Sequence, residues 1–151
     1  MKKDKLMFFI VDDDPFSAAI FRQYLIFEGY RNIHVFNNGK DCLDSMHEEP
    51  DVIILDHYMS PVNGTEVLKK VKETNPGIYV IYASSSTDAG LISNSLQKGA
   101  FCYIIKGEND LANLVRELRK IEDAIKLLKY SSVKCNRDYP LTYNRNAFSL
   151  S

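Results

Sequence analysis

The segment DVIILD, residues 51–56, sets four consecutive apolar residues between two acids. A short, unbroken apolar run rich in β-branched residues is typical of a strand that is buried on both faces. The run ends at Asp56, and the polar segment HYMSPVNG follows it. The segment therefore predicts a buried strand that carries a carboxylate to one edge of a sheet.

Four more apolar runs and five segments of helical spacing surround this strand. The other predicted strands are Leu6–Val11, Asn32–Phe36, Ile78–Ala83 and Phe101–Ile105, and the predicted helices span about 15–28, 39–48, 65–74, 88–98 and 109–129. Strict alternation of strands and helices predicts a parallel sheet covered on both faces. We therefore expect an α/β fold: a doubly wound five-stranded parallel sheet in a flavodoxin-like three-layer sandwich.

The helix boundaries follow from local signals. Asp14 before Pro15 predicts an N-cap followed by proline in the first turn, and Asn38 predicts the cap of the second helix. In the first helix one face is formed by Phe16, Ala19, Ile20, Gln23, Tyr24 and Phe27. This spacing is typical of a helix, and Gly29 is expected to end it.

Composition excludes several classes of protein. The 151 residues are 45% hydrophobic and 26% charged, with a net charge of −1, so nothing favours binding to nucleic acid or to an anionic membrane. Three widely spaced cysteines predict neither a zinc site nor a disulfide framework. The apolar run Leu6–Val11 is too short for an export signal, and a cytoplasmic location is expected.

Polar residues follow four of the five predicted strands. They are Asp12, Asp13 and Asp14 after the first, Asp56 after the third, Ser84 after the fourth and Lys106 after the fifth. The carboxyl ends of parallel strands meet at one edge of the sheet, where ligands bind. Converging carboxylates favour a hard cation such as Mg²⁺. These residues predict a Mg²⁺-assisted phosphoryl-transfer site with Asp56 or an N-terminal aspartate as the nucleophile.

Over residues 5–125 the chain resembles the receiver domains of two-component response regulators. IVDDDP resembles the acidic pair after the first strand of that family, which implies a metal-binding role for Asp12 and Asp13. DVIILD resembles its third strand and implies that Asp56 is the phosphoacceptor and a metal ligand. The backbone carbonyl of Tyr58 is implied as a further metal ligand.

The resemblance extends to the last two strands. Ser84 stands 28 residues after Asp56 and matches the hydroxyl position of the family, and KGAFCYIIK matches its fifth strand. This implies catalytic roles for Ser84 and Lys106, and switch roles for Ser84 and Tyr103. The chain departs from the family at Ser60-Pro61, where proline comes one residue late, and at Gly107, where proline is usual.

The resemblance implies a domain of residues 1–126 that is controlled by phosphorylation. A sensor histidine kinase or a histidine phosphotransfer protein would phosphorylate Asp56 with Mg²⁺, and the altered surface would bind a downstream protein target. No enzyme activity is expected beyond this phosphotransfer and slow autodephosphorylation, and no direct contact with nucleic acid or a membrane. As a hypothesis, bulky Tyr58 lengthens the phosphorylated lifetime.

The segment 127–151 is expected to be a helix extension followed by a polar, basic and flexible tail. The stripe Leu111, Leu114, Leu118, Ile121, Ile125 and Leu128 has heptad spacing, and its part from Ile121 onward predicts a surface for homodimerisation. Docking of the tail through Tyr130, Tyr139, Tyr143 and Phe148 is an alternative. His57 is expected to be solvated, and His34 and His47 to lack partners.

Three other functions stay open at this point. A haloacid-dehalogenase-type phosphatase would use Asp12 as nucleophile and Asp14 as acid, but no second acidic pair follows Ile105. A degenerate receiver would bind partners without being phosphorylated, which the intact Asp56, Ser84 and Lys106 argue against. A DNA-binding regulator would need an output domain for which these residues leave no room.

Overall fold

Five parallel strands form one sheet in the order β2-β1-β3-β4-β5. The strands are β1 (Met7–Val11), β2 (Asn32–Phe36), β3 (Val52–Leu55), β4 (Tyr79–Ser84) and β5 (Cys102–Ile105). The structure, a computed structural model, describes residues 3–138, with the backbone alone for 133–138. The predicted flavodoxin-like α/β fold is confirmed.

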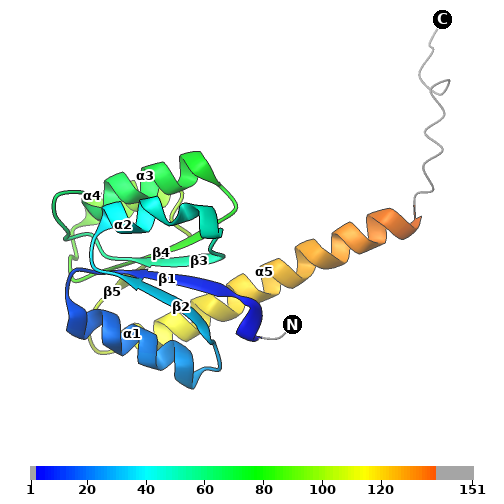
Figure 1. Cartoon of the computed structure of the whole chain (residues 1–151), viewed down its shortest axis with the longest axis horizontal. Coiled ribbons are helices and arrows are strands. Elements are labelled where there is room, and N and C mark those ends of the chain that lie inside the picture. The colour runs from blue at the N-terminus through cyan, green and yellow to red at the C-terminus, as the bar shows by residue number, and fades with distance from the viewer. Residues whose placement is uncertain (1–2, 139–151) are drawn as a thin grey trace, which may run out of the picture. The chain divides into compact units, whose positions relative to one another are not determined.

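Helices cover both faces of the sheet (Figure 1). One face carries α1 (Pro15–Phe27), and the other carries α2 (Gly39–Asp44), α3 (Gly64–Thr74) and α4 (Ala89–Gln97). The fifth helix, α5, spans Asp110–Asp138. On the α3 side, the core joins residues of β1, β3 and β4, such as Phe9, Leu55 and Tyr82, to Val67, Leu68 and Val71 of α3.

The strand register places the ends of β1 and β3 side by side. Val11 pairs with Leu55, so Asp12 and Asp56 follow neighbouring strands at the same edge. The Asp56 N–H donates to the Val11 carbonyl at 2.9 Å, which extends the pairing by one residue. The helix that follows β1, α1, lies on one face of the sheet, and the helix that follows β3, α3, lies on the other face. This is the switch point at which ligands bind in such folds.

The face of α1 that carries Phe16 and Phe27 is not the buried one. The buried residues are Ala18, Phe21 and Leu25, whereas Phe16 and Phe27 are 73% and 77% exposed. The helix is apolar on more than one side, so periodicity alone did not identify the face that packs. As a result, α1 presents large apolar side chains to solvent.

Two predicted helix boundaries also differ. The second helix ends at Asp44 instead of residue 48, and a 3₁₀ turn, Met46–Glu48, follows it. Glu49 then has a φ of 57°, a left-handed conformation that stops any helix. The fifth helix continues to Asp138, nine residues past its predicted end, so the helix extension is longer than expected.

The fifth helix also corrects the expected dimer surface. Ile121 is fully buried, so it is not part of an available surface, while Leu127, Leu128 and Tyr130 are 65–67% exposed. Chain contacts divide the protein into two units between Glu117 and Leu118, inside α5. The predicted boundary at 126/127 stays a prediction, and Tyr139, Tyr143 and Phe148 lie outside the described residues.

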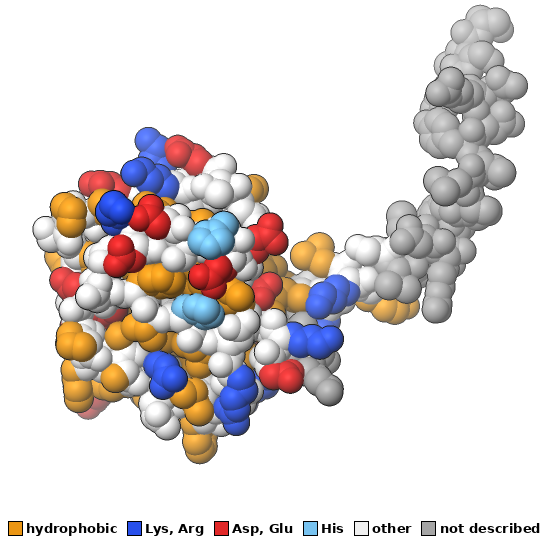
Figure 2. Space-filling view, in the orientation of Figure 1, with side chains coloured by type: hydrophobic (Ala, Val, Ile, Leu, Met, Phe, Trp, Pro, Cys, Tyr) orange, Lys and Arg blue, Asp and Glu red, His pale blue; other side chains and the backbone are white. Residues whose placement is uncertain are grey.

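Charges are interspersed on the face of the molecule shown in Figure 2. Basic and acidic side chains alternate there with apolar ones, without a continuous basic area. Between residues 3 and 138, the chain contains no helix with the length and apolar character needed to cross a bilayer.

Candidate functional site

Three carboxylates converge at the switch point. Asp12, Asp13 and Asp56 each bring one carboxylate oxygen within 4.8 Å of those of the other two. Asp12 is 3% exposed and Asp56 is 6% exposed, whereas Asp13 is open to solvent. The pairing of β1 with β3 creates this cluster from residues that are distant in the sequence.

Lys106 binds two of these carboxylates. Its Nζ donates to Asp12 Oδ2 at 2.7 Å and to Asp56 Oδ1 at 3.1 Å. Lys106 follows β5, and its own N–H donates to the Ser84 carbonyl at 2.9 Å, which ties the end of β5 to the end of β4. The expected meeting of the first, third and fifth strand ends at one edge is thus observed.

The charges at this edge change one another's pKa values. Burial raises the pKa of Asp56, the negative charge of Asp12 raises it further, and Lys106 opposes both. For Lys106, burial alone would lower the pKa, but the hydrogen bond to Asp12 and the charges of Asp56 and Asp12 raise it overall. The ammonium group therefore stays charged and holds two carboxylates that would otherwise repel each other.

Asp14 is a helix cap and is not part of the cluster. Its side chain accepts the N–H of Phe16 at 3.0 Å, as its position before Pro15 predicted. The Asp14 N–H donates to Asp12 Oδ1 at 2.9 Å, which fixes the Asp12 carboxylate at the start of the loop. The turn into α1 thus orients Asp12 toward Lys106.

The donor set fits a hard divalent cation. Three carboxylates within one oxygen-only cluster suit Mg²⁺ better than a soft metal. Asp13 is exposed and approachable from solvent, while Asp12 and Asp56 are fixed by Lys106 and by strand pairing. The structure brings the predicted ligands Asp12, Asp13 and Asp56 together, and their binding of a metal, like that of the Tyr58 carbonyl, stays a prediction.

Ser84 and Tyr103 belong to one hydrogen-bonded group. Ser84 is fully buried, and its Oγ accepts the N–H of Ser86 at 3.2 Å. The Tyr103 hydroxyl donates to the Ser86 carbonyl at 2.9 Å. Tyr103 is therefore directed toward the loop after β4, although its role as a switch, like that of Ser84, stays a prediction.

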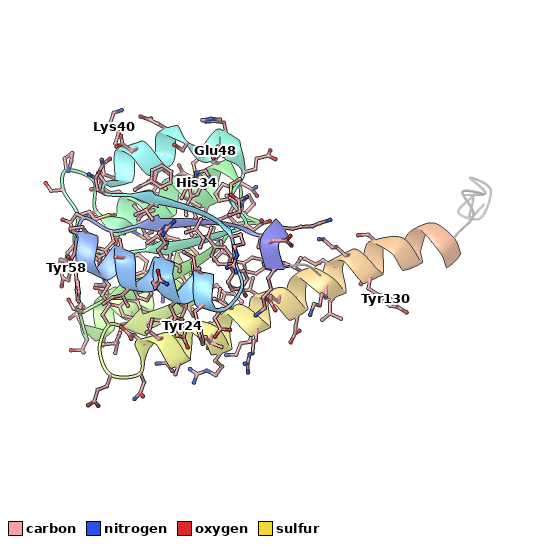
Figure 3. The ribbon with its side chains drawn as sticks, turned by 60° about the horizontal axis from the view of Figure 1, so that its bottom comes forward. Tyr24, His34, Lys40, Glu48, Tyr58 and Tyr130 are labelled. Atoms are coloured by element: carbon pink, nitrogen blue, oxygen red, sulfur yellow. The ribbon has the colours of Figure 1, made fainter. Side chains whose placement is uncertain are left out.

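Tyr58 lies at the end of the molecule toward which the strands point (Figure 3). It is 57% exposed, and its ring makes an edge contact with His57 at 4.9 Å between centroids. The loop that it begins contains a cis peptide bond between Ser60 and Pro61, where the sequence departs from the family.

The departure from the family at Gly107 is also seen in the backbone of the structure. Gly107 has a φ of +147°, which only glycine adopts without strain, and its N–H donates to Asp110 Oδ2 at 3.2 Å. Proline, which lacks an N–H and holds φ near about −65°, fits neither feature. The loop after Lys106 is therefore built differently from that of relatives that carry proline there.

His57 is not the solvated side chain that the sequence suggested. Its Nδ1 lies 2.6 Å from the hydroxyl of Tyr82, a fully buried residue of β4. The prediction missed Tyr82 because its strand reads as uniformly apolar. A tyrosine inside such a run is nevertheless a signal, since a buried hydroxyl needs a polar partner.

The other two histidines also have partners. His34 Nδ1 lies 3.4 Å from Glu48 Oε2, and the two side chains are labelled close together in Figure 3. His47 Nδ1 lies 3.1 Å from the Asp44 carbonyl. The His34 contact joins β2 to the 3₁₀ turn after α2, whereas the His47 contact joins this turn to the last residue of α2.

Comparisons with known proteins agree with this geometry. Residues 8–131 match the family model of the response regulator receiver domain. The transcriptional regulatory protein ZraR of Escherichia coli K12 is 31% identical over 121 residues, which are 80% of this chain and 27% of ZraR. The chain thus spans about a quarter of the length of such curated relatives.

Solved structures show the same likeness. A CheY-like receiver domain from Methanospirillum hungatei has a TM-score of 0.72 and 27% identity, covering 80% of this chain and 97% of that one. A BeF3-activated DrrB receiver domain has a TM-score of 0.66 and 27% identity, covering 76% and 97%. By its sequence, its sheet order and its carboxylate–lysine cluster, the chain belongs to the response regulator receiver domain family.

Proposed function

We propose that the protein accepts a phosphoryl group on Asp56 from a phosphohistidine and that this controls a protein-interaction surface. The observation that carries the proposal is the bridge from Lys106 to both Asp12 and Asp56. It provides a fixed nucleophile, an acidic partner and a cation at one sheet edge. A cation beside the nucleophile can offset the negative charge of a phosphoryl group.

The reaction is a direct displacement. An Asp56 carboxylate oxygen attacks the phosphorus of the phosphohistidine, a P–O bond forms, and the P–N bond breaks with its electron pair returning to the imidazole. Lys106, which contacts Asp56, and the buried Ser84 would bind phosphoryl oxygens of the product. Mg²⁺ held by Asp12, Asp13 and Asp56 would supply positive charge that offsets the phosphoryl oxygens.

The phosphodonor, a sensor histidine kinase or a histidine phosphotransfer protein, needs a docking surface near Asp56. The exposed apolar side of α1 begins with Phe16, three residues after the cluster residue Asp13. Further along, Ile20, Gln23, Tyr24, Phe27 and Leu111 line an open groove of about 460 Å³. An apolar surface of the donor would cover these residues while its histidine reaches Asp56.

A downstream protein is the proposed reader of the phosphorylated state. Leu96 of α4, Phe101 before β5 and Ile105 at its end are 36–45% exposed on the side that carries Tyr103. A change at Ser84 and Tyr103 would alter this surface. Cytoplasmic location, the absence of nucleic-acid contacts and the absence of further enzyme activity stay predictions.

Mass spectrometry tests the proposal. Incubation with acetyl phosphate and Mg²⁺ is expected to add one phosphoryl group to the parent, which peptide mapping places on Asp56. Asp56→Asn is expected to abolish the adduct. Asp14→Asn is the matched control, because asparagine also caps a helix and Asp14 lies outside the cluster.

Each other outcome supports a different function. An adduct on Asp12, or turnover of a small phosphate ester, would indicate the phosphatase. A parent protein that acquires no adduct would indicate a receiver that only binds partners.

A further inference from the structure

The hydroxyl of Tyr82 is buried beneath the loop that carries Asp56. Tyr82 is fully buried in β4, where it pairs with Leu55 on one side and with Tyr103 on the other. Its hydroxyl lies 2.6 Å from His57 Nδ1 and 3.3 Å from Thr65 Oγ1. One side chain in the core thus contacts the residue next to the phosphoacceptor and the first turn of α3.

The loop is built around this hydroxyl. A Cβ added at Gly64 would lie 2.6 Å from the Tyr82 oxygen, so only glycine leaves it room. The His57 carbonyl accepts the N–H groups of Met59 and Gly64, each at 3.0 Å. Burial raises the pKa of Tyr82 to about 12, so the hydroxyl is neutral and keeps its proton.

The ring of Tyr82 reaches the predicted switch residue. It stacks on Tyr103 with 5.6 Å between centroids and 18° between planes. Tyr103 in turn donates to the Ser86 carbonyl, and the Ser86 N–H donates to Ser84 Oγ. Contacts therefore run from His57 through Tyr82 and Tyr103 to the loop of Ser84.

We propose that Tyr82 is a positioning residue that couples the Asp56 loop to Tyr103. The hydrogen bond to His57 fixes one end of the Tyr82 side chain, and the stacked ring passes any movement of this loop to Tyr103. The inference rests on the proposed phosphorylation of Asp56. It adds a connection through the core to the contacts that Ser84 and Ser86 make in the loop after β4.

The proposed coupling requires that the Tyr82 side chain is held rigidly in the core. Tyr82 is fully enclosed, so its ring cannot turn independently of its neighbours. Removal of the hydroxyl by Tyr82→Phe keeps the stacked ring and breaks the contacts with His57 and Thr65. The proposal requires that the phosphorylated arrangement holds this hydrogen bond more firmly than the unphosphorylated one, so its removal corresponds to about a three- to tenfold loss in affinity for a phosphoryl group or its mimic.

The test uses beryllofluoride with Mg²⁺ as the phosphoryl mimic and 3-fluorotyrosine as a ¹⁹F label. Tyr103→Phe identifies the Tyr103 resonance. In the parent, the probe is expected to shift this resonance and to give an apparent Kd. In Tyr82→Phe, the Kd is expected to rise about three- to tenfold and the shift at saturation to be smaller, a change that reduced stability alone would not produce.

Two further variants test which contact of the Tyr82 hydroxyl carries the coupling. His57→Phe removes the same hydrogen bond from the other side and is expected to reproduce Tyr82→Phe, with no further effect in the double variant. Thr65→Val removes the other contact of the same hydroxyl and is expected to stay within about twofold of the parent, since its 3.3 Å contact is the weaker one.

The outcomes separate this inference from the proposed function. If the parent gives no response to the probe, both fail. If the parent responds and Tyr82→Phe matches it, or if the effects of Tyr82→Phe and His57→Phe add fully, the coupling role fails and the proposed phosphorylation site stands.

Discussion

Lys106 Nζ lies 2.7 Å from Asp12 Oδ2, although 94 residues separate the two in the chain. The contact joins the ends of β5 and β1, which are not neighbours in the sheet. The contact therefore crosses the site. Asp56 follows β3, which lies between β1 and β5 in the sheet, and it also accepts a hydrogen bond from Lys106. This cation therefore offsets two buried negative charges when no phosphoryl group is present.

Lys106→Met is expected to destabilise the protein. Methionine keeps the length of the side chain but leaves Asp12 and Asp56, which are 3% and 6% exposed, without a cation. Removing one partner of a buried ion pair leaves the other charge unpaired. Because Lys106 is partly open to solvent, we expect the free energy of unfolding to fall by about 2–3 kcal/mol. Urea denaturation measures this loss.

The matched control is Lys40→Met. Lys40 pairs with Asp44 at 2.6 Å one turn away on the surface of α2, so the same substitution removes a salt bridge without exposing buried charge. We expect a much smaller loss. Equal losses in the two variants would show that the Lys106 bridge contributes no more than a surface pair.

Stability of Lys106→Met is expected to depend on pH in a defined direction. Burial and Asp12 already raise the pKa of Asp56, and removal of Lys106 raises it further. The folded state then binds protons more tightly than the unfolded state, so stability falls as pH rises through the folded pKa. Denaturation of the variant should therefore need more urea at mildly acidic than at neutral pH, whereas a pH-independent midpoint would contradict this account.

Asp13→Asn is expected to stabilise the protein when Mg²⁺ is absent. Asp13 lies within 4.8 Å of two other carboxylates and is exposed, so removing its charge relieves about 1 kcal/mol of repulsion in water. Added Mg²⁺ is expected to raise the Tm of the parent more than that of the variant. Asp14→Asn, the control outside the cluster, should leave both measurements unchanged.

The sheet and its charged edge were predictable because both follow from strong local patterns. Apolar runs identified all five strands, and the acids and lysine directly after those runs identified Asp12, Asp56 and Lys106. The packed face of α1 was not predictable, because Phe16 and Phe21 are equally apolar and only the tertiary fold buries one of them. The bond from His57 to Tyr82 was missed for a similar reason, since it joins side chains across two strands.

Gly64→Ala is expected to destabilise the protein by about 1–3 kcal/mol, as overpacking in a core does. Its Cβ would lie 2.6 Å from the Tyr82 hydroxyl and 2.8 Å from the His57 Cα, and it would also meet the Asp56 carbonyl. Gly77→Ala is the control, because its nearest neighbour is the Asn75 side chain in an exposed turn. Thermal denaturation that ranks the two variants equally would refute the tight packing of this loop.

Cys42 is expected to resist alkylation in the folded protein. Burial leaves its thiol without exposed surface and raises its pKa to about 12, so almost no thiolate exists near pH 8. Cys102 is only partly buried and should react with iodoacetamide much faster. Peptide mapping over time compares the two, and after unfolding in urea both cysteines should react at similar rates. Equal rates in the folded state would contradict the enclosed position of Cys42.

The exposed apolar residues of α5 are expected to mediate self-association. Leu127, Leu128 and Tyr130 are 65–67% exposed, and Leu128 continues the heptad stripe after Ile125. Burying such a stripe against a second copy would stabilise a dimer. Leu128→Asp is expected to weaken association at least about tenfold, because it places a charge in the apolar contact. Sedimentation over a range of concentrations measures this, with Ser131→Asp as a control that adds the same charge to an exposed position off the stripe. A parent that sediments as a monomer at every concentration would exclude the dimer.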